Sequence, residues 1–206
     1  MNKLLIAFLA LIFSATCTGA PKDDAHAAMQ RGEYQKALEI LLPIAEAGDV
    51  DALGNVGNMY AFGQGTEKDI DKAHSYWLRA SDKHLGTAMG NIAVLYVTGQ
   101  GQIKKDISQA AVWYKRAAEH RHWQSMITLS SLYMLGQGIE QNKIQALAWA
   151  GLAASNAPTQ AAKNSSVNQL QKIAAGMSKE EIQQAQDASN QLAKIIDDNV
   201  AKYKAQ

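Results

Sequence analysis

The sequence predicts an all-α protein, an α/α solenoid in which helix pairs stack side by side and further helices cap the C-terminal end. The segment YAFGQG at 60–65 recurs as YVTGQG at 96–101 and YMLGQG at 133–138, at spacings of 36 and 37 residues. A second segment follows each copy: DKAHSYWLRAS at 71–81, SQAAVWYKRAA at 108–118 and IQALAWAGLAA at 144–154. Repetition at this period is typical of stacked helical units. The composition, with 47% hydrophobic residues and three prolines, suits packed helices.

Each repeat is predicted to fold as two helices. In the first unit these span about 51–62 and 71–83, and apolar residues recur there every three or four positions. Helices of this length, about 18 Å each, cannot bury an apolar face alone, so neighbouring pairs must stack. The predicted solenoid covers residues 21–157. It comprises an N-terminal helix pair at about 23–48 and repeats at about 51–86, 87–122 and 123–157.

One aligned position of the first helices always carries a small residue, namely Gly57, Ala93 or Ser130. A small side chain allows two helices to approach closely, whereas a leucine would push them apart. This position is therefore predicted to lie at a helix contact.

Aromatic rings recur with the same regularity. They occupy Tyr60, Tyr96 and Tyr133 on the first helices, and Tyr76, Trp113 and Trp149 on the second helices. Such recurrence predicts an interlocking core rather than a surface that stacks a ligand. Trp123 has no aromatic counterpart, and the sequence leaves open whether it packs at a turn or makes an exposed contact.

The repeated Gly-Gln-Gly could cradle a phosphate or form a turn between two helices. A phosphate loop follows a strand and supplies a lysine and a hydroxyl at fixed places. Here a helix precedes the glycines, and Gly65 is followed by Thr66, Glu67 and Lys68 in the wrong order. Gly63 is therefore predicted to end the first helix in a left-handed conformation, and Gly65 to let the chain reverse.

The first twenty residues, MNKLLIAFLALIFSATCTGA, are predicted to be a secretory signal peptide. A lysine precedes an apolar run at 4–13, and small residues follow it. That run is about half the roughly 20 residues that a membrane span needs. The mature protein is expected to be exported, either periplasmic or secreted, without a stable transmembrane anchor. Cys17, the only cysteine, offers lipidation as an alternative.

Residues 158–206 are predicted to form helices that cap the array, because the last repeat of a solenoid otherwise exposes its apolar face. Ser178 and Glu181 have the spacing of a capping box that begins a helix running to about Lys204. As an alternative, the outer half of this helix would mediate a homodimer.

The motif set resembles the Sel-one-like repeat (SLR) family of tetratricopeptide-like α/α solenoids. The resemblance covers roughly residues 25–157 and rests on Gly-x-x-Tyr-x-x-Gly-x-Gly at 57–65, the polar loop, and the alanine and aromatic positions of the second helices. It implies a noncatalytic protein–protein interaction or scaffolding role, as an adaptor or regulator in the bacterial envelope. The family commonly ends its second helix on a glycine. Gly48 fits, but His84 and Arg121 replace it in later units, so strained or differently built turns are expected.

The sequence offers no catalytic residue, cofactor or metal site. It contains neither the Gly-x-Ser-x-Gly nor the His-Glu-x-x-His motif, and its densest histidine cluster is His120-Arg121-His122 at a predicted turn. These histidines are interpreted as polar surface residues, although a role for His120 and His122 is left open. The formal net charge of +1 does not indicate a nucleic-acid partner.

A protein or peptide partner is predicted to bind the concave face, which the first helices of such solenoids line. Side chains with amides or hydroxyls recur there in two columns, and amides can pair with a peptide backbone or with sugar hydroxyls. The predicted partner-binding residues are Asn55, Asn58, Asn91, Thr128 and Ser131. Asparagine costs a helix about 0.6 kcal/mol relative to alanine, and the sequence shows no structural reason for it. Two alternatives remain open: a face that is simply polar, and a hydrolase of cell-wall or related envelope material.

Overall fold

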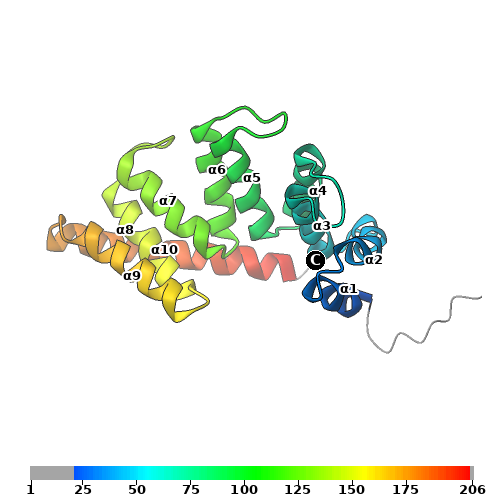
Figure 1. Cartoon of the computed structure of the whole chain (residues 1–206). Helices are drawn as coiled ribbons and strands as arrows, with labels where there is room; N and C mark the ends of the chain where they lie inside the picture. Colours follow the sequence, from blue (N-terminus) through cyan, green and yellow to red (C-terminus); the bar gives the residue numbers. More distant parts are fainter. Residues whose placement is uncertain (1–20, 205–206) are drawn as a thin grey trace, which may run out of the picture.

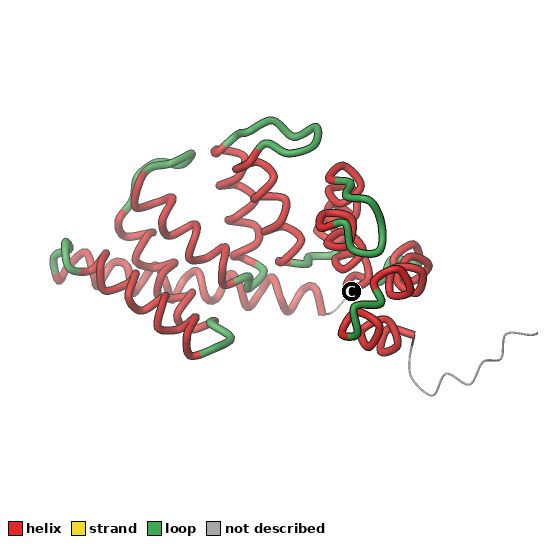
Figure 2. Tube along the Cα trace, viewed as in Figure 1, coloured by secondary structure: helices red, strands yellow, loops and turns green. Residues whose placement is uncertain are grey.

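The computed structural model describes residues 21–204, which fold into ten helices and no strand (Figures 1 and 2). The helices are α1 Pro21–Gln30, α2 Tyr34–Glu46, α3 Val50–Phe62, α4 Ile70–Asp82, α5 Gly86–Thr98, α6 Ile107–Glu119, α7 Trp123–Leu135, α8 Lys143–Asn156, α9 Gln160–Ala174 and α10 Lys179–Lys204. Consecutive helices pair and the pairs stack in chain order, which confirms the predicted all-α solenoid. The predicted signal peptide and Cys17 lie outside the described residues.

Side-chain caps and glycines define where the helices of each repeat begin and end. Asp69 and Asp106 cap the second helices by accepting hydrogen bonds from backbone N–H groups three residues later, at 2.9 and 3.0 Å. Gly63, Gly99 and Gly136 end the first helices at φ angles of 66°, 69° and 67°. The predicted left-handed conformation of Gly63 is confirmed.

The second glycine of each turn has a further function that sequence reasoning missed. A Cβ added to Gly101 would lie 2.5 Å from Asp71 Oδ1, at the start of the second helix of the preceding pair. Gly138 lies equally close to the backbone of Ile107, and Gly65 to the backbone of Tyr34. The turn therefore also makes the joint between one helix pair and the next.

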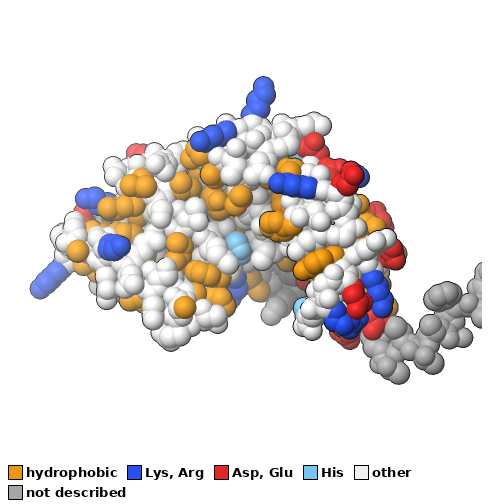
Figure 3. Space-filling model, viewed as in Figure 1, with side chains coloured by type: hydrophobic (Ala, Val, Ile, Leu, Met, Phe, Trp, Pro, Cys, Tyr) orange, Lys and Arg blue, Asp and Glu red, His pale blue; other side chains and the backbone are white. Residues whose placement is uncertain are grey.

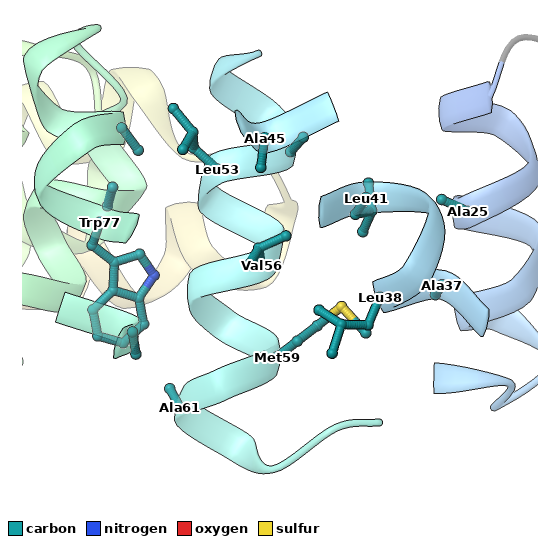
Figure 4. Packing of buried hydrophobic residues seen from close by; sticks show 14 of the residues in the cluster. Ala25, Ala37, Leu38, Leu41, Ala45, Leu53, Val56, Met59, Ala61 and Trp77 are labelled. Atoms are coloured by element: carbon teal, nitrogen blue, oxygen red, sulfur yellow. The ribbon is translucent and has the colours of Figure 1, made fainter. Parts of the chain in front are cut away.

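In the described part of the chain, buried apolar side chains pack between the helices of each pair and between adjacent pairs, in four clusters along the array. Figure 4 shows Val56 and Met59 of α3 on the side that faces α2, where Met59 points toward Leu38. Trp77 of α4 lies on the opposite side of α3. One helix thus packs against both its own partner and the preceding pair, as a stacked array requires.

The prediction for the repeated rings of the second helices is correct only for Trp149, which is 1% exposed. Tyr76 and Trp113 are half-buried, and the rings that fill the core are their neighbours Trp77 and Tyr114, at 4% and 9% exposure. Adjacent residues on a helix point about 100° apart, so only one of each pair can face the first helix.

Tyr76 is held at the edge of the core instead. Its ring stacks on Tyr60 at a centroid distance of 5.7 Å, and its hydroxyl donates a 2.9 Å hydrogen bond to Glu46. Arg79 pairs with the same carboxylate at 2.9 Å. The hydrogen bonds from Arg79 and Tyr76 lower the pKa of Glu46. The contacts of Tyr76 and Arg79 with Glu46 join α4 to α2 of the preceding pair.

Two turns adopt a backbone conformation that suits glycine although they carry other residues. His84 and Arg121 have φ angles of 65° and 62°, in the left-handed region that Gly48 also occupies at 89°. The following N–H groups complete the same helix ending in both turns, since Leu85 and His122 donate to the carbonyls of Ala80 and Ala117. Of the two expectations, strained or differently built turns, the second is not met, since both turns keep the glycine-type ending with a non-glycine residue at positive φ.

The last two helices pack on the final repeat. Helix α9 lies against α8, whereas α10 runs back along α8 and reaches α6. The predicted capping box is confirmed: Glu181 accepts from the Ser178 N–H at 2.7 Å, and Ser178 Oγ accepts from the Glu181 N–H at 3.2 Å. Ile196 is buried beside Trp149, while Ile195 is 47% exposed, and a homodimer through α10 stays a prediction.

Candidate partner-binding face

The first helices of the three repeats present one stripe of side chains toward solvent, which we call the first-helix face. Its members recur at helical spacing on α3, α5 and α7. They are Asp51, Asn55, Asn58 and Phe62; Thr87, Asn91, Val94 and Thr98; and Gln124, Thr128, Ser131 and Leu135. The five predicted partner-binding residues all belong to this face, and all five are half-buried.

Three of the predicted residues meet in one cavity. Asn55, Asn58 and Asn91 line a space of about 340 Å³ that is also lined by residues of α1, including His26. Thr128 and Ser131 do not belong to it. The structure therefore places the asparagines together at the N-terminal part of the face.

Asn58 has a structural role, so the expectation that these asparagines lack one is wrong for this residue. Its Oδ1 accepts hydrogen bonds from Trp77 Nε1 at 3.1 Å and from Asn91 Nδ2 at 2.9 Å. The first bond satisfies the indole, and the second links α3 to α5. Asn55, by contrast, makes no side-chain hydrogen bond to any residue in 21–204 and keeps its donor and acceptor groups unused.

The other two predicted residues have different surroundings. Thr128 Oγ1 donates to the carbonyl of Gln124 in its own helix at 3.0 Å. Ser131 Oγ accepts a 3.0 Å hydrogen bond from Gln169 Nε2 of α9, and the same amide also lies within hydrogen-bond distance of Ser130 Oγ and the Ile127 carbonyl. Sequence reasoning missed Gln169, because nothing local to α9 indicates that it reaches α7.

The electrostatics of the face are simple. Asp51 is its only charged member, and Lys22 of α1 lies 3.9 Å from that carboxylate. Lys22 also pairs with Asp49 at 2.7 Å, and this hydrogen bond, together with the one from the Ala52 N–H, lowers the pKa of Asp49. The face therefore presents hydrogen-bonding groups and apolar surface more than charged groups.

The histidines near the turns, interpreted from the sequence as polar surface residues, are half-buried. The rings of His84 and His120 lie 5.0 Å apart, and His122 Nδ1 lies 2.8 Å from Ser125 Oγ. Burial lowers the pKa of His122. Ser125 is fully buried, so this pair presents no hydroxyl to a substrate.

Within residues 21–204, no three His, Cys, Asp or Glu side chains lie close enough together to hold a metal ion. None of the ten helices in that range combines the length and the hydropathy that crossing a membrane requires. Trp123, whose role the sequence left open, begins α7 and is half-buried.

Comparison with known proteins agrees with the three helical repeats described above. A family model described as Sel1 repeat matches residues 50–85, 86–122 and 123–157. No curated protein matches.

Two similar solved structures share the fold. One is c5321, described as a protective antigen present in uropathogenic Escherichia coli strains displaying an SLR fold, with 27% identity and a TM-score of 0.73 over 85% of this chain. The other is a Sel1 repeat protein from Oxalobacter formigenes, with 23% identity and a TM-score of 0.68 over 84% of this chain. The chain spans 38% of the length of the first and 69% of the second.

Proposed function

Because the chain belongs to the Sel1 repeat family, whose members generally mediate protein–protein interactions, we propose that it is a noncatalytic adaptor or scaffold that binds an extended protein segment on the first-helix face. The observation that carries this proposal is the meeting of Asn55, Asn58 and Asn91 in one cavity. The alternative of a hydrolase is favoured by no specific feature of the described residues.

The chemistry of an extended peptide fits these amides. A peptide backbone alternates N–H donors and carbonyl acceptors, and each asparagine side chain offers both kinds of group. Asn55 has both groups unused, and Asn91 has used only its Nδ2 as donor. An extended segment that lies across α3 and α5 can therefore exchange backbone hydrogen bonds with the two side chains.

The location that we propose is the bacterial envelope or the exterior of the cell. The predicted signal peptide at residues 1–20 supports export. The description of the similar E. coli protein as a protective antigen is consistent with such a location. An adaptor or regulator of envelope proteins is the role that we infer from these observations.

Site-specific photocrosslinking in cells tests the proposal. A crosslinker at Asn55, which makes no internal side-chain hydrogen bond, should capture one defined protein partner, and mass spectrometry identifies it. A crosslinker at Glu39, exposed on α2, is the control and should not capture that partner. Equal capture from both positions would refute binding on the first-helix face.

Substitution gives an independent measurement. The double variant Asn55→Leu/Asn91→Leu should weaken the captured interaction about tenfold, because each lost hydrogen bond is worth roughly 0.5–1.5 kcal/mol. Asn190→Leu, at an exposed asparagine of α10, is the matched control. Unchanged affinity of a folded double variant would contradict the proposal. Asn58 is not a suitable target, because its removal leaves the Trp77 indole N–H without its partner.

A further inference from the structure

A second cavity lies at the other end of the first-helix face, between α7 and α9. It has a volume of about 510 Å³ and is lined by Ser131 of the face. Its apolar part comes from Met134, Leu135 and Ile173. Leu135 ends α7 and is 63% exposed, so the cavity offers unused apolar surface to a ligand.

The α9 side of this cavity is a stripe of hydrogen-bond donors. Ser165, Asn168 and Lys172 follow one another at spacings of three and four residues, so they share one face of the helix. None of the three makes a side-chain hydrogen bond or an ion pair with a residue in 21–204, whereas Gln169 beside them is held by α7. A hydroxyl, an amide and an ammonium group therefore remain available together.

The charge around this cavity favours an anion. No acidic residue lines it. Residues 86–178 hold eight basic residues (Lys or Arg) and three acidic residues (Asp or Glu). Residues 21–85 hold seven basic and eleven acidic residues. Figure 3 shows a similar contrast, since most acidic side chains gather over α1–α4, while the part over α7–α9 shows hydrophobic patches among other side chains with Lys and Arg at its edge. A carboxylate is attracted to such a surface, and the contrast along the array gives the whole face a direction.

We propose that this cavity binds the free C-terminal carboxylate of the partner segment together with an apolar last side chain. Lys172 and the neighbouring donors of α9 hold the carboxylate, and Met134, Leu135 and Ile173 surround the side chain. Since Ser131 belongs both to this cavity and to the first-helix face, a segment that leaves the asparagine cavity can continue along the face and end here. The inference rests on the proposed function in that the ligand is a peptide.

The test uses two peptide pools that differ only at the last group. Both are acetylated hexapeptides with five randomised positions and a final leucine, one with a free carboxylate and one with an amide. In ¹⁵N-edited NMR spectra of the purified protein, the free-acid pool should shift the side-chain amide signal of Asn168 and the backbone signals around Lys172. The amidated pool should need at least about fivefold higher concentration for half-saturation, because a charge-assisted hydrogen bond is lost.

A pair of charge reversals on the same helix supplies the control. Lys172→Glu should raise the half-saturation concentration of the free-acid pool about tenfold. Lys163→Glu makes the same change in charge at an exposed residue outside the cavity and should leave binding unchanged. Circular dichroism confirms that both variants remain folded.

Five results would overturn the inference: equal titration by the two pools, no effect of Lys172→Glu, equal loss in both lysine variants, no shift with either pool at millimolar concentration, or tighter binding of decanoate than of the free-acid pool. The last result would assign the cavity to a fatty-acid carboxylate. The two proposals can fail separately. If the Asn55→Leu/Asn91→Leu variant still captures the partner in cells and still binds the free-acid pool, the proposed function fails and the carboxylate cavity stands. If that variant loses capture while Lys172→Glu leaves binding of the free-acid pool unchanged, the proposed function stands and the carboxylate cavity fails.

Discussion

The indole of Trp77 lies directly against Gly57: a Cβ added to Gly57 would come 2.6 Å from ring atoms Cδ1 and Nε1. The same two positions in the next units carry Ala93 with Tyr114 and Ser130 with Ala150. The residue on the second helix thus becomes smaller as the residue on the first helix becomes larger. In the third unit, Ser130 Oγ bonds directly to the Ala146 carbonyl at 2.7 Å. Each helix pair is close-packed by a different combination, as expected of protein interiors.

Gly57→Ala should therefore destabilise the protein by about 1–3 kcal/mol, the usual cost of adding a methyl group to a filled contact. Urea unfolding followed by circular dichroism measures the change. The double variant Gly57→Ala/Trp77→Tyr copies the combination of the second unit and should recover part of the loss. A single variant as stable as the original protein would show that α3 and α4 can separate at little cost.

Gly151 gives the opposite expectation. It lies within α8, and a Cβ added there would make only ordinary contacts, at 3.7 Å from Leu170 and 3.8 Å from Ser189. Gly151→Ala should stabilise the protein by about 0.4–1 kcal/mol, because alanine loses less backbone entropy on folding. Differential scanning calorimetry should show a Tm increase of a few degrees. A decrease would mean that the space between α8, α9 and α10 closes in solution.

The two left-handed turns provide a matched pair of substitutions. His84→Gly should stabilise the protein by about 1 kcal/mol, because a non-glycine residue is strained at a φ of 65°. Arg121→Gly should gain less, since it removes the ion pair with Asp197 and the hydrogen bond to Asn156, whereas His84→Gly removes a tilted ring contact with His120. Thermal unfolding of both variants tests this order. The explanation fails if His84→Gly lowers the Tm, or if Arg121→Gly gains as much as His84→Gly.

Acid should destabilise the fold through its half-buried histidines. Burial lowers the pKa of His122 below its ordinary value of 6.5; burial and the neighbouring His84 and Arg116 act in the same direction on His120. The unfolded chain then binds protons more readily than the folded one. These histidines therefore do not reduce the free energy of unfolding above pH 6.5. The free energy falls as the pH drops from 6.5 through the lower pKa values that the two histidines have in the folded protein.

The variant His122→Leu/Ser125→Ala tests that source of acid sensitivity. It copies Leu85 and Ala88, which occupy the same positions one unit earlier. Urea midpoints measured between about pH 7 and 5 should depend less on pH than those of the original protein. The same slope for both proteins would remove His122 as a cause.

The sequence predicts the parts of this fold that depend on local periodicity. Helices, their glycine ends and the small contact position at Gly57, Ala93 and Ser130 all follow from recurrence at fixed spacing. The choice between Tyr76 and Trp77 does not, because both lie on the apolar side of the helix and a rotation of 100° decides which ring is covered. In the structure, Gly57 leaves space for the Trp77 indole, and Asn58 accepts a hydrogen bond from its Nε1.

The candidate site could be predicted from the sequence even less than the fold could. The asparagine column could be read from the alignment of the repeats, but the hydrogen bond from Asn91 to Asn58 connects residues 33 positions apart. The reach of Gln169 to Ser131 spans 38 positions and depends on how α9 packs after the last repeat. Such bonds are properties of the stacked array, and no single repeat contains them.

The joints made by Gly65 and Gly138 bring the glycine against the backbone of the neighbouring unit, whereas Gly101 meets the side chain of Asp71. A contact with backbone does not depend on which amino acids the neighbouring unit carries. A unit can then be duplicated or deleted during evolution without the simultaneous adaptation of two surfaces. The number of units, and with it the length of the partner segment that the protein can hold, becomes a quantity that changes in steps of one helix pair.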